Sequence, residues 1–457
     1  MGAQNYLRDN KGTMLSHLSL GYTLKRPSWL SVQGDIMNRD ELEKRRNALL
    51  KLSKIMRNKQ SEWVKRSVDE TFVTTKYAKV DNFQAQRGMA FKSYELDFLE
   101  GRLPLGKIRL QFPKNAVGVA MGVSFAAAYM AGNSIDIRLS STQEGLADLI
   151  ADIISEAELQ EISVIKADSK VFMKDSILGG YNGLHVFGHD RNIIPWSKEI
   201  GQTIEQGYLD IFAAELTGKD FYFVLEDANV KKAAKDFLAA ATISSGQVCM
   251  SPEAAFVHES RRNEFIKYLI EYSHYLTVGD PYNRKTDIGP LLSEGVYKNA
   301  VHHLEDAIRR GAEEHSAGKF RFTKNYEHWE KNLLIPDKVL VVNDWESTAL
   351  HEETFCPGLI VVPFKYYDQV INHMRSLDYG LTSSIYGKNM LNVVKERMNG
   401  LIGIIFENQP FFRGFDVHKR CWGGFKKSGW VQYKDKNGEV KRVHGPKHLI
   451  SLFSRPD

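Results

Sequence analysis

The chain has 457 residues, enough for about three domains, and 43% of them are hydrophobic and 26% charged. This balance fits large buried cores and excludes a disordered or low-complexity chain. Lys and Arg outnumber Asp and Glu by 61 to 56, and a formal charge of +5 argues neither for nucleic acid nor for a membrane surface. The three cysteines, Cys249, Cys356 and Cys421, are too few for a disulfide framework and indicate a reducing compartment.

The N-terminal segment gives no sign of a targeting signal. Its first twenty residues lack the contiguous apolar core of a signal peptide. Residues 1–37 show no clear periodicity, so we expect part of this segment to be irregular. One apolar run, 116–131, is rich in Gly and Ala and spans sixteen residues, which is short for a bilayer and typical of a buried helix. We therefore expect a soluble, cytoplasmic protein without membrane association.

Helical periodicity begins at residue 38. Asn38 can cap a helix, and Glu41 can reach back to it as in a capping box. The apolar side chains that follow fall on one helical stripe among Lys and Arg residues, as in a helix packed on a core. They are Leu42, Leu49, Leu52, Met56 and Trp63.

Strands and helices alternate from residue 106 onwards. The expected strands are 106–112, 134–139, 162–167 and 183–188, and the expected helices are 116–131, ended by Gly132-Asn133, and 143–158. Strands separated by helices at this spacing predict a parallel, doubly wound sheet, which is the usual home of a nucleotide.

A second alternating block starts near residue 221. The expected strands are 221–227, 254–260, 359–364 and 403–406, and the expected helices are 228–241 and 261–275. No repeat and no biased linker separates the two blocks, so they should pack against each other. The last stretch, 444–457, can form one short apolar strand, and such an edge usually pairs with another strand.

Three residues in separate parts of the chain suggest covalent catalysis. Cys249 follows small residues, which lets a substrate approach its sulfur closely, and Glu215 lies in an apolar setting that raises a carboxyl pKa. Asn115 sits at a strand-to-helix turn, where its amide could point at a developing oxyanion. A lone cysteine is more often a buried core residue, but together the three fit a thiolate nucleophile with a carboxylate that activates water.

Seven short motifs occur in a characteristic order. They are Pro113-Lys114-Asn115, Gly132-Asn133, ELTGK (215–219), GQVC (246–249), the run FVHES, VGDP and DIGPL, EETFCP (352–357) and GGFKKSG (423–429). With this set, the chain resembles the NAD(P)-dependent aldehyde dehydrogenase superfamily from about residue 40 to about residue 450, as a divergent member. The resemblance implies an α/β, aldehyde-dehydrogenase-like fold with a Rossmann-like cofactor domain, an α/β catalytic domain and a small oligomerisation element.

The resemblance also implies catalytic roles. Cys249 would attack the aldehyde, while the Asn115 amide and the Cys249 backbone N–H would hold the oxyanion. Hydride would then pass to the nicotinamide and leave a thioester. Glu215 would activate the water that hydrolyses this thioester and releases the carboxylic acid.

The expected cofactor is NADP or NAD, and the resemblance implies six residues for its site. These are Arg138, Ser141, Gly188, Leu216, Glu353 and Phe355. Glu353 matches the residue that holds the nicotinamide ribose, Phe355 packs against that end, and Gly188 precedes the helix whose N-terminus receives the pyrophosphate. Arg138 replaces a lysine, and Ser141 stands where NAD-preferring members often carry Glu, so we expect NADP to be accepted.

Other positions depart from the family pattern. The stretch after Gly188, HDRNIIPWSKEIG, is longer than the family's tight glycine loop, and its second glycine would be Gly201 after an insertion. Lys114 replaces the Trp beside the oxyanion Asn, and Thr217 replaces the first Gly of its motif. Two alternatives stay open: a degenerate member with a binding or structural role, and a CoA-acylating dehydrogenase. The presence of Glu215 argues for water rather than a thiol as the acceptor.

The resemblance further implies how the chain is divided. The expected units are a cofactor-binding domain over 1–85 and 105–217, a catalytic domain over 218–408, and an oligomerisation hairpin over 86–104 with a C-terminal strand within 435–457. We therefore expect a homodimer or homotetramer that acts on a small-molecule aldehyde and binds no nucleic acid. His185 and His189 lie on a strand-to-loop segment, and no metal is expected.

Overall fold

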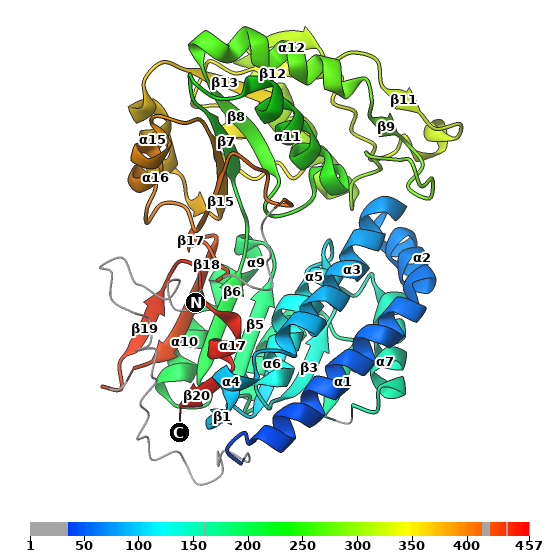
Figure 1. The fold of residues 1–457 in the computed structure, drawn as a ribbon, viewed down its shortest axis with the longest axis vertical. Coiled ribbons are helices and arrows are strands. Elements are labelled where there is room, and N and C mark those ends of the chain that lie inside the picture. Colours follow the sequence, from blue (N-terminus) through cyan, green and yellow to red (C-terminus); the bar gives the residue numbers. More distant parts are fainter. Residues whose placement is uncertain (1–34, 160, 414–420, 436, 457) are drawn as a thin grey trace.

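The computed structural model describes residues 35–159, 161–413, 421–435 and 437–456. The irregular structure expected at the N-terminus falls largely on residues 1–34, outside the described part. Two lobes follow one another along the long axis, and each is built around a seven-stranded sheet (Figure 1). The two blocks expected from the sequence thus form two packed lobes. No described helix is both long and apolar enough to cross a membrane.

The lower lobe in Figure 1 holds a sheet with the strand order β19-β18-β6-β5-β2-β3-β4. Its parallel strands are β2 (Lys107–Gln111), β3 (Ser134–Arg138), β4 (Ile162–Ile165), β5 (Gly183–Phe187) and β6 (Ile211–Glu215), and its antiparallel strands are β18 (Gly429–Lys434) and β19 (Val440–Val443). The chain order reverses at β2, which pairs with β3 on one side and β5 on the other. Open α/β sheets bind ligands at such a switch point, beside the carboxyl ends of the strands.

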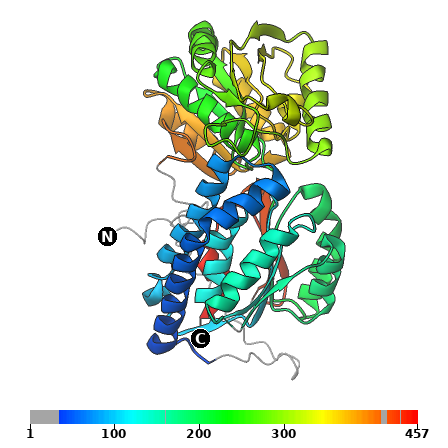
Figure 2. The same cartoon turned by 90° about the vertical axis from the view of Figure 1, so that its right-hand side faces the viewer.

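Two core clusters cover the two faces of this sheet. The helices on one face are α1 (Arg39–Asn58), α2 (Gln60–Thr71), α3 (Thr75–Lys92) and α7 (Glu144–Glu156), and those on the other are α8 (Ser169–Leu178) and α10 (Ser197–Glu205). Asn38 caps α1 by accepting a hydrogen bond from the Glu41 N–H at 2.9 Å, and the predicted apolar stripe is buried. Figure 2 shows these N-terminal helices rising along the lower lobe to the upper one.

The expected helix over 116–131 forms in three parts. They are α5 (Val117–Ala120), a π-helical turn (Met121–Phe125) and α6 (Ala126–Met130). Gly132 adopts a φ of +90° and ends the helix, as its motif predicts. A π-helical turn inside an α-helix often marks a functional site, and this helix begins two residues after Asn115.

The connection after β5 differs from the expectation. α9 (Asp190–Ile193) and a 3₁₀ turn (Ile194–Trp196) lead directly into α10. Pro195 fits this turn because its fixed φ suits the first turn of a helix. Gly201 consequently lies inside α10 and faces Gln432 of β18. Gly201 is therefore not the second glycine of a phosphate loop.

The upper lobe contains a sheet with the order β10-β12-β13-β8-β7-β15-β16. Its strands are β7 (Asp220–Val224), β8 (Pro252–His258), β10 (Glu313–Ser316), β12 (Lys338–Val341), β13 (Ile360–Phe364), β15 (Thr382–Tyr386) and β16 (Ile404–Glu407). Its helices are α11 (Val230–Thr242), α12 (Arg262–Ser273), α13 (Glu294–Arg309), α14 (Thr348–His351), α15 (Tyr367–Ser376) and α16 (Leu391–Arg397). Minor elements are β9 (Thr277–Val278), β11 (Arg321–Phe322) and three 3₁₀ turns, Ile243–Gly246, Glu259–Arg261 and Tyr326–Trp329.

The hairpin expected over 86–104 is wrong. Helix α3 continues to Lys92, and α4 (Leu96–Leu99) and β1 (Arg102–Pro104) follow it. The expected strand over 444–457 is replaced by a helical turn, α17 (Leu449–Leu452), and β20 (Ser454–Pro456), which pairs antiparallel with β1. β19, which the sequence had placed within the oligomerisation element, belongs to the lower sheet instead.

Two contacts fasten the C-terminal segment of the lower lobe to the upper lobe. β14 (Tyr379–Gly380) pairs with β17 (Phe425–Lys426) at the junction. The Lys426 ammonium donates to the carbonyls of Met374, Arg375 and Leu377 at the end of α15, at 2.8, 3.0 and 2.5 Å. A cation on the last carbonyls of a helix is favourable because these groups carry partial negative charge.

Candidate active site

A cavity of about 750 Å³ lies between the lobes. Eight of the nine residues predicted for the site line it: Asn115, Arg138, Gly188, Glu215, Leu216, Cys249, Glu353 and Phe355. The ninth, Ser141, is exposed and lies outside the lining, where its neighbour Ser140 takes part instead. The cavity therefore unites residues that are up to 240 positions apart in the chain, between Asn115 and Phe355.

The loop that carries Cys249 has an unusual backbone. Ser244, Ser245 and Gly246 have consecutive φ values of +51°, +56° and +74°, a left-handed conformation that is costly for residues other than Gly. A Cβ on Gly246 would lie 2.2 Å from the Cys356 carbonyl oxygen, so only glycine fits there. The small residues before the thiol thus bring its loop against residues 352–357, which provide Glu353 and Phe355.

Asn115 is held beside the nucleophile loop by its own amide. Its Nδ2 donates to the Gln247 carbonyl at 2.9 Å, and Gln247 is itself buried, with its Oε1 accepting from the Leu292 N–H at 2.7 Å. An amide nitrogen has two N–H groups. The bond to Gln247 fixes the side chain and leaves a second N–H for an oxyanion.

The Cys249 thiol is partly exposed at the cavity wall and unpaired. Burial raises the pKa of this thiol well above its usual range, and the carboxyl groups of Asp220, Glu353 and Glu215 raise it further. Before reaction, the sulfur is therefore protonated at neutral pH. A nucleophile in this state needs a base in the site to take its proton.

Glu215 ends β6 and presents its carboxyl group to two glycines of the GGFKKSG motif. A Cβ on Gly423 or on Gly429 would lie 3.4 Å from a Glu215 carboxyl oxygen. Its Oε2 is buried and has no hydrogen-bond partner among the described residues. Burial raises the pKa of this carboxyl well above its usual value, and the Lys447 charge and the Trp422 indole oppose that rise. A carboxyl group of this kind can hold a proton taken from water.

A buried ion pair that was not predicted from the sequence supports the Glu353 loop. The Glu253 carboxylate pairs with the Lys219 ammonium and accepts from the N–H groups of Thr354 (2.8 Å) and Phe355 (2.7 Å). Phe355 has a φ of +55°, and these bonds hold that strained turn. Glu353 in turn accepts from the Gly218 N–H at 3.1 Å. The sequence offered one hint of this ion pair, because a charged residue stands at the start of each of two neighbouring apolar strands.

Burial also raises the pKa of the Glu353 carboxyl, with the Glu253 charge as the next cause. Glu353 lines the cavity. Its carboxyl group can accept hydrogen bonds from hydroxyl groups, such as those of a ribose.

Helix α3 forms one wall of the cavity with residues that the sequence analysis did not select. Tyr77, Val80, Gln84 and Arg87 recur at intervals of three and four, so they share one helical face. Phe411, Phe412 and Trp422 line the cavity as well. The helical spacing of the first four residues could be recognised in the sequence. The sequence does not show, however, whether this helical face lines a cavity or packs into a core.

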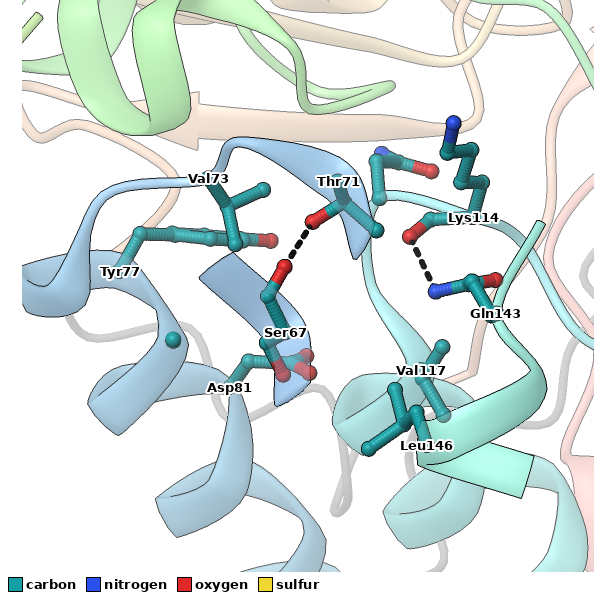
Figure 3. A pocket seen from close by; sticks show the side chains of 11 residues that line it. Ser67, Thr71, Val73, Tyr77, Asp81, Lys114, Val117, Gln143 and Leu146 are labelled. Carbon is teal, nitrogen blue, oxygen red and sulfur yellow. Dashed lines mark hydrogen bonds between the residues drawn. The ribbon is translucent and has the colours of Figure 1, made fainter. Parts of the chain in front are cut away.

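A second, small cavity lies behind Asn115 and contains a buried acid (Figure 3). Asp81 of α3 accepts from the N–H groups of Gly118 (2.8 Å) and Val119 (3.0 Å), which are donors of the first turn of α5. Burial raises the pKa of Asp81 to about 7, although these two bonds oppose the shift. Asp81 thereby ties α3 to the helix that begins next to Asn115.

Asp81→Asn should change how the stability of the chain depends on pH. The folded carboxyl has a pKa of about 7 against 3.8 ordinarily, so between these values the folded chain binds a proton that the unfolded chain releases. This group should therefore lower the free energy of unfolding by up to about 1.4 kcal/mol per unit as the pH rises through that window. Urea denaturation across the window should show a flatter profile for the variant. The exposed Asp152→Asn serves as a control, and identical profiles for Asp81→Asn and wild type would contradict the assignment.

Within the described residues, no group of three or more His, Cys, Asp or Glu side chains is placed to hold a metal ion. His185 lies inside the lower lobe, where its Nδ1 bonds to the Ser124 hydroxyl at 2.6 Å. Burial lowers the pKa of His185 to about 3. His189 is on the far side of Gly188, where its Nδ1 accepts from the Arg191 N–H at 3.2 Å. The two histidines therefore have separate partners.

The sheet and the cavity together define an α/β protein with a cavity of a size that a dinucleotide can occupy beside a thiol. The model of the aldehyde dehydrogenase family matches residues 33–442. The chain belongs to this family. Membership confirms three predictions from the sequence: the fold class, NAD(P)-dependent oxidation of an aldehyde, and the use of NAD or NADP.

Individual relatives agree with this assignment. A lactaldehyde dehydrogenase from Methanococcus maripaludis is 28% identical over 380 residues, which cover 79% of this chain and 75% of the relative. The crystal structure of an NAD-dependent aldehyde dehydrogenase from Sinorhizobium meliloti matches with a TM-score of 0.78 at 19% identity, over 92% of this chain and 81% of the other. That of lactaldehyde dehydrogenase from Escherichia coli matches with a TM-score of 0.76 at 23% identity, over 91% and 85%. At such identities, the solved structures establish the fold.

Proposed function

We propose that this chain oxidises its aldehyde to the carboxylic acid through a covalent intermediate on Cys249, with Glu215 and Asn115 as the other catalytic residues. The observation that carries the proposal is that these three residues line one cavity at the switch point of the lower sheet. In this proposal, the lower lobe binds NAD(P), and the upper lobe, within 218–408, supplies the thiol.

In the first half of the reaction, the Cys249 sulfur bonds to the carbonyl carbon and gives up its proton. Glu215 is suited to take that proton because its own pKa is raised. The carbonyl oxygen becomes an oxyanion, which accepts from the second N–H of the Asn115 amide and from the Cys249 backbone N–H. When bound, the nicotinamide ring supplies the acceptor for the hydride that leaves this carbon. A thioester on Cys249 remains.

In the second half, Glu215 first releases the thiol proton to the solvent in the cavity and is ionised again. A water molecule then attacks the thioester. The buried Oε2 of Glu215, which has no partner among the described residues, takes a proton from this water as its oxygen bonds to the acyl carbon. The carbon–sulfur bond then breaks, the carboxylic acid leaves, and the Cys249 sulfur regains a proton.

The residues at the site fit a dinucleotide. A cavity of about 750 Å³ has the size of a cofactor site. Glu353 offers a fixed carboxyl group for the hydroxyls of the nicotinamide ribose. Arg138 lines the cavity at the end of β3, with its Nε bonded to the Ala167 carbonyl at 3.1 Å.

We also propose a cytoplasmic homodimer or homotetramer. The sheet of β1 and β20 has only two strands, and the far side of β1 already bonds to the Met37 backbone. The far side of β20 carries no further strand within the described part of the chain, and an open edge is a natural place for a second subunit. None of Cys249, Cys356 and Cys421 forms a disulfide, which suits a reducing compartment. Sedimentation of the purified chain measures its oligomeric state.

A panel of aliphatic, aromatic and acidic aldehydes, assayed with NAD and with NADP, tests the proposed reaction. Formation of NAD(P)H together with the carboxylic acid from at least one aldehyde is expected. Dinucleotide binding without turnover of any aldehyde would instead favour the degenerate alternative, a protein with a binding role.

For cofactor choice, NADP should bind at least as tightly as NAD. No carboxylate from β3 or the turn after it lines the cavity, and Ser140 stands there beside Arg138. Ser140→Glu should weaken NADP binding by about tenfold or more and affect NAD little, because it places a charge next to the 2′-phosphate. Fluorescence titration of both reduced cofactors measures this effect. A wild-type preference for NAD above about tenfold, roughly 1.4 kcal/mol, would contradict the prediction.

A further inference from the structure

Four of the backbone N–H groups that would normally receive a pyrophosphate after β5 are already used within the chain. The N–H groups of Gly188, Asp190 and Asn192 donate to the Glu215 carbonyl at 3.2 Å, the Thr217 hydroxyl at 3.1 Å and the His189 carbonyl at 3.0 Å. The Arg191 N–H donates to the His189 ring at 3.2 Å. α9 has only one turn, so little of a helix dipole adds to these donors.

A buried negative charge occupies the same place. Asp190 is 4% exposed and accepts from the Thr217 hydroxyl at 2.9 Å and from Tyr379 at 3.2 Å. Burial favours the neutral acid, but the adjacent His189 ring and the bonds from Thr217 and Tyr379 outweigh it and lower the pKa of Asp190 to about 2. A carboxylate at this end of the loop repels a phosphate, which is the reverse of a helix N-terminus that attracts one.

A single cation of this loop faces the cavity. The Arg191 side chain is 66% exposed, lines the cavity, and bonds through Nη2 to the Glu352 carboxylate of the opposite lobe at 2.6 Å. Glu352 lies next to Glu353, so this ion pair spans the cavity beside the proposed ribose contact. Exposed pairs of this kind are weak, whereas a guanidinium can bind a phosphate with two parallel donors.

We propose that the Arg191 guanidinium exchanges Glu352 for the cofactor pyrophosphate, and that this side chain replaces the helix N-terminus as the phosphate-binding group. The inference rests on the proposed function of the cavity. It also connects two departures from the family pattern. Thr217 stands where the family has Gly. Its hydroxyl accepts a hydrogen bond from the Asp190 N–H and donates one to the Asp190 carboxylate. The altered loop therefore depends on Thr217, and it needs a side-chain cation in place of the lost backbone donors.

Direct binding measurements on Arg191→Met, Glu352→Gln and Lys198→Met test this proposal. Lys198 is exposed in α10 and outside the cavity lining, so it controls for the loss of one positive charge near the loop. NADH and NADPH are titrated by fluorescence, and ADP-ribose and adenosine are then used as competitors. ADP-ribose carries the pyrophosphate, and adenosine does not.

Arg191→Met should weaken the binding of both dinucleotides and of ADP-ribose by at least about tenfold, which corresponds to about 1.4 kcal/mol, and should leave adenosine competition within about twofold. Lys198→Met should bind like the wild type, and Glu352→Gln should bind as tightly or more tightly, because it releases Arg191. Wild-type affinity in Arg191→Met would overturn the inference. An equal loss in Glu352→Gln would also overturn it, since the pair would then only join the lobes. A wild-type chain that binds no dinucleotide would overturn the proposed function itself.

Discussion

Cys249→Ala should abolish NAD(P)H formation with every aldehyde in the panel. Removing the sulfur removes the only atom proposed to form a covalent bond with the substrate, and hydride transfer depends on the tetrahedral carbon that this bond creates. We expect a loss of at least about a thousandfold in kcat/KM, or about 4 kcal/mol of transition-state stabilisation. Absorbance assays of NAD(P)H, with a parallel fluorescence titration of the cofactor, measure the effect.

The matched control is Cys421→Ala. Cys421 is also in no disulfide and partly exposed, but the cavity lining does not include it. This variant should stay within a few-fold of the wild type. Cofactor binding should persist in Cys249→Ala, because alanine fills less space than cysteine. Turnover by Cys249→Ala within about tenfold of the wild type would rule out a covalent mechanism at this residue.

Glu215→Gln should separate the two halves of the reaction. The amide cannot take a proton from water, so steady-state turnover should fall by about a hundredfold or more. Hydride transfer precedes that step, so a first burst of about one equivalent of NAD(P)H per site should remain, at a lower rate because Glu215 also takes the thiol proton. Stopped-flow absorbance measures both phases, and mass spectrometry of the quenched variant should find the acyl group on Cys249.

The pH dependence of the wild type follows from the same carboxyl group. Glu215 must be ionised to act as a base, and its pKa is raised, so turnover should rise with pH through that pKa. Lys447→Met removes a positive charge that lowers the pKa of Glu215. The rising part of the pH–rate profile should therefore move to higher pH in this variant. Unchanged steady-state rates in Glu215→Gln would refute its role. Full recovery of that variant by added CoA would favour the acylating alternative.

Local patterns predicted most of the regular structure because they depend on nearby residues. The apolar run before Gly132 forms the predicted helix. The alternating strands and helices from residue 106 onwards form the predicted doubly wound sheet. The motif residues also came together, since the carboxyl ends of parallel strands meet at one edge of a sheet. Eight of nine predicted residues consequently line one cavity.

Features that depend on distant contacts were not predicted. The hairpin over 86–104 failed because Ala85 and Met89 bury a continuous helical face, which keeps α3 helical to Lys92. From the sequence, Gly201 could lie in a loop or in a helix. In the structure it lies in α10 and faces Gln432, a neighbour more than two hundred positions away that the sequence does not reveal. The sequence gives no reason for a charged residue, Glu253, in an apolar strand. Its partners are Lys219 and the turn at Phe355, and only the folded structure brings them beside it.

The hydrogen bonds from Lys426 to the end of α15 have a consequence for how the cofactor leaves the enzyme. A hinge that swung the lobes apart would have to strip this ammonium from three carbonyls and break the short pairing of β14 with β17. We therefore expect the gap between the lobes to keep its width, so that the reduced cofactor leaves without a hinge opening. We expect its departure, rather than bond breaking at the aldehyde, to set the pace for the best substrates.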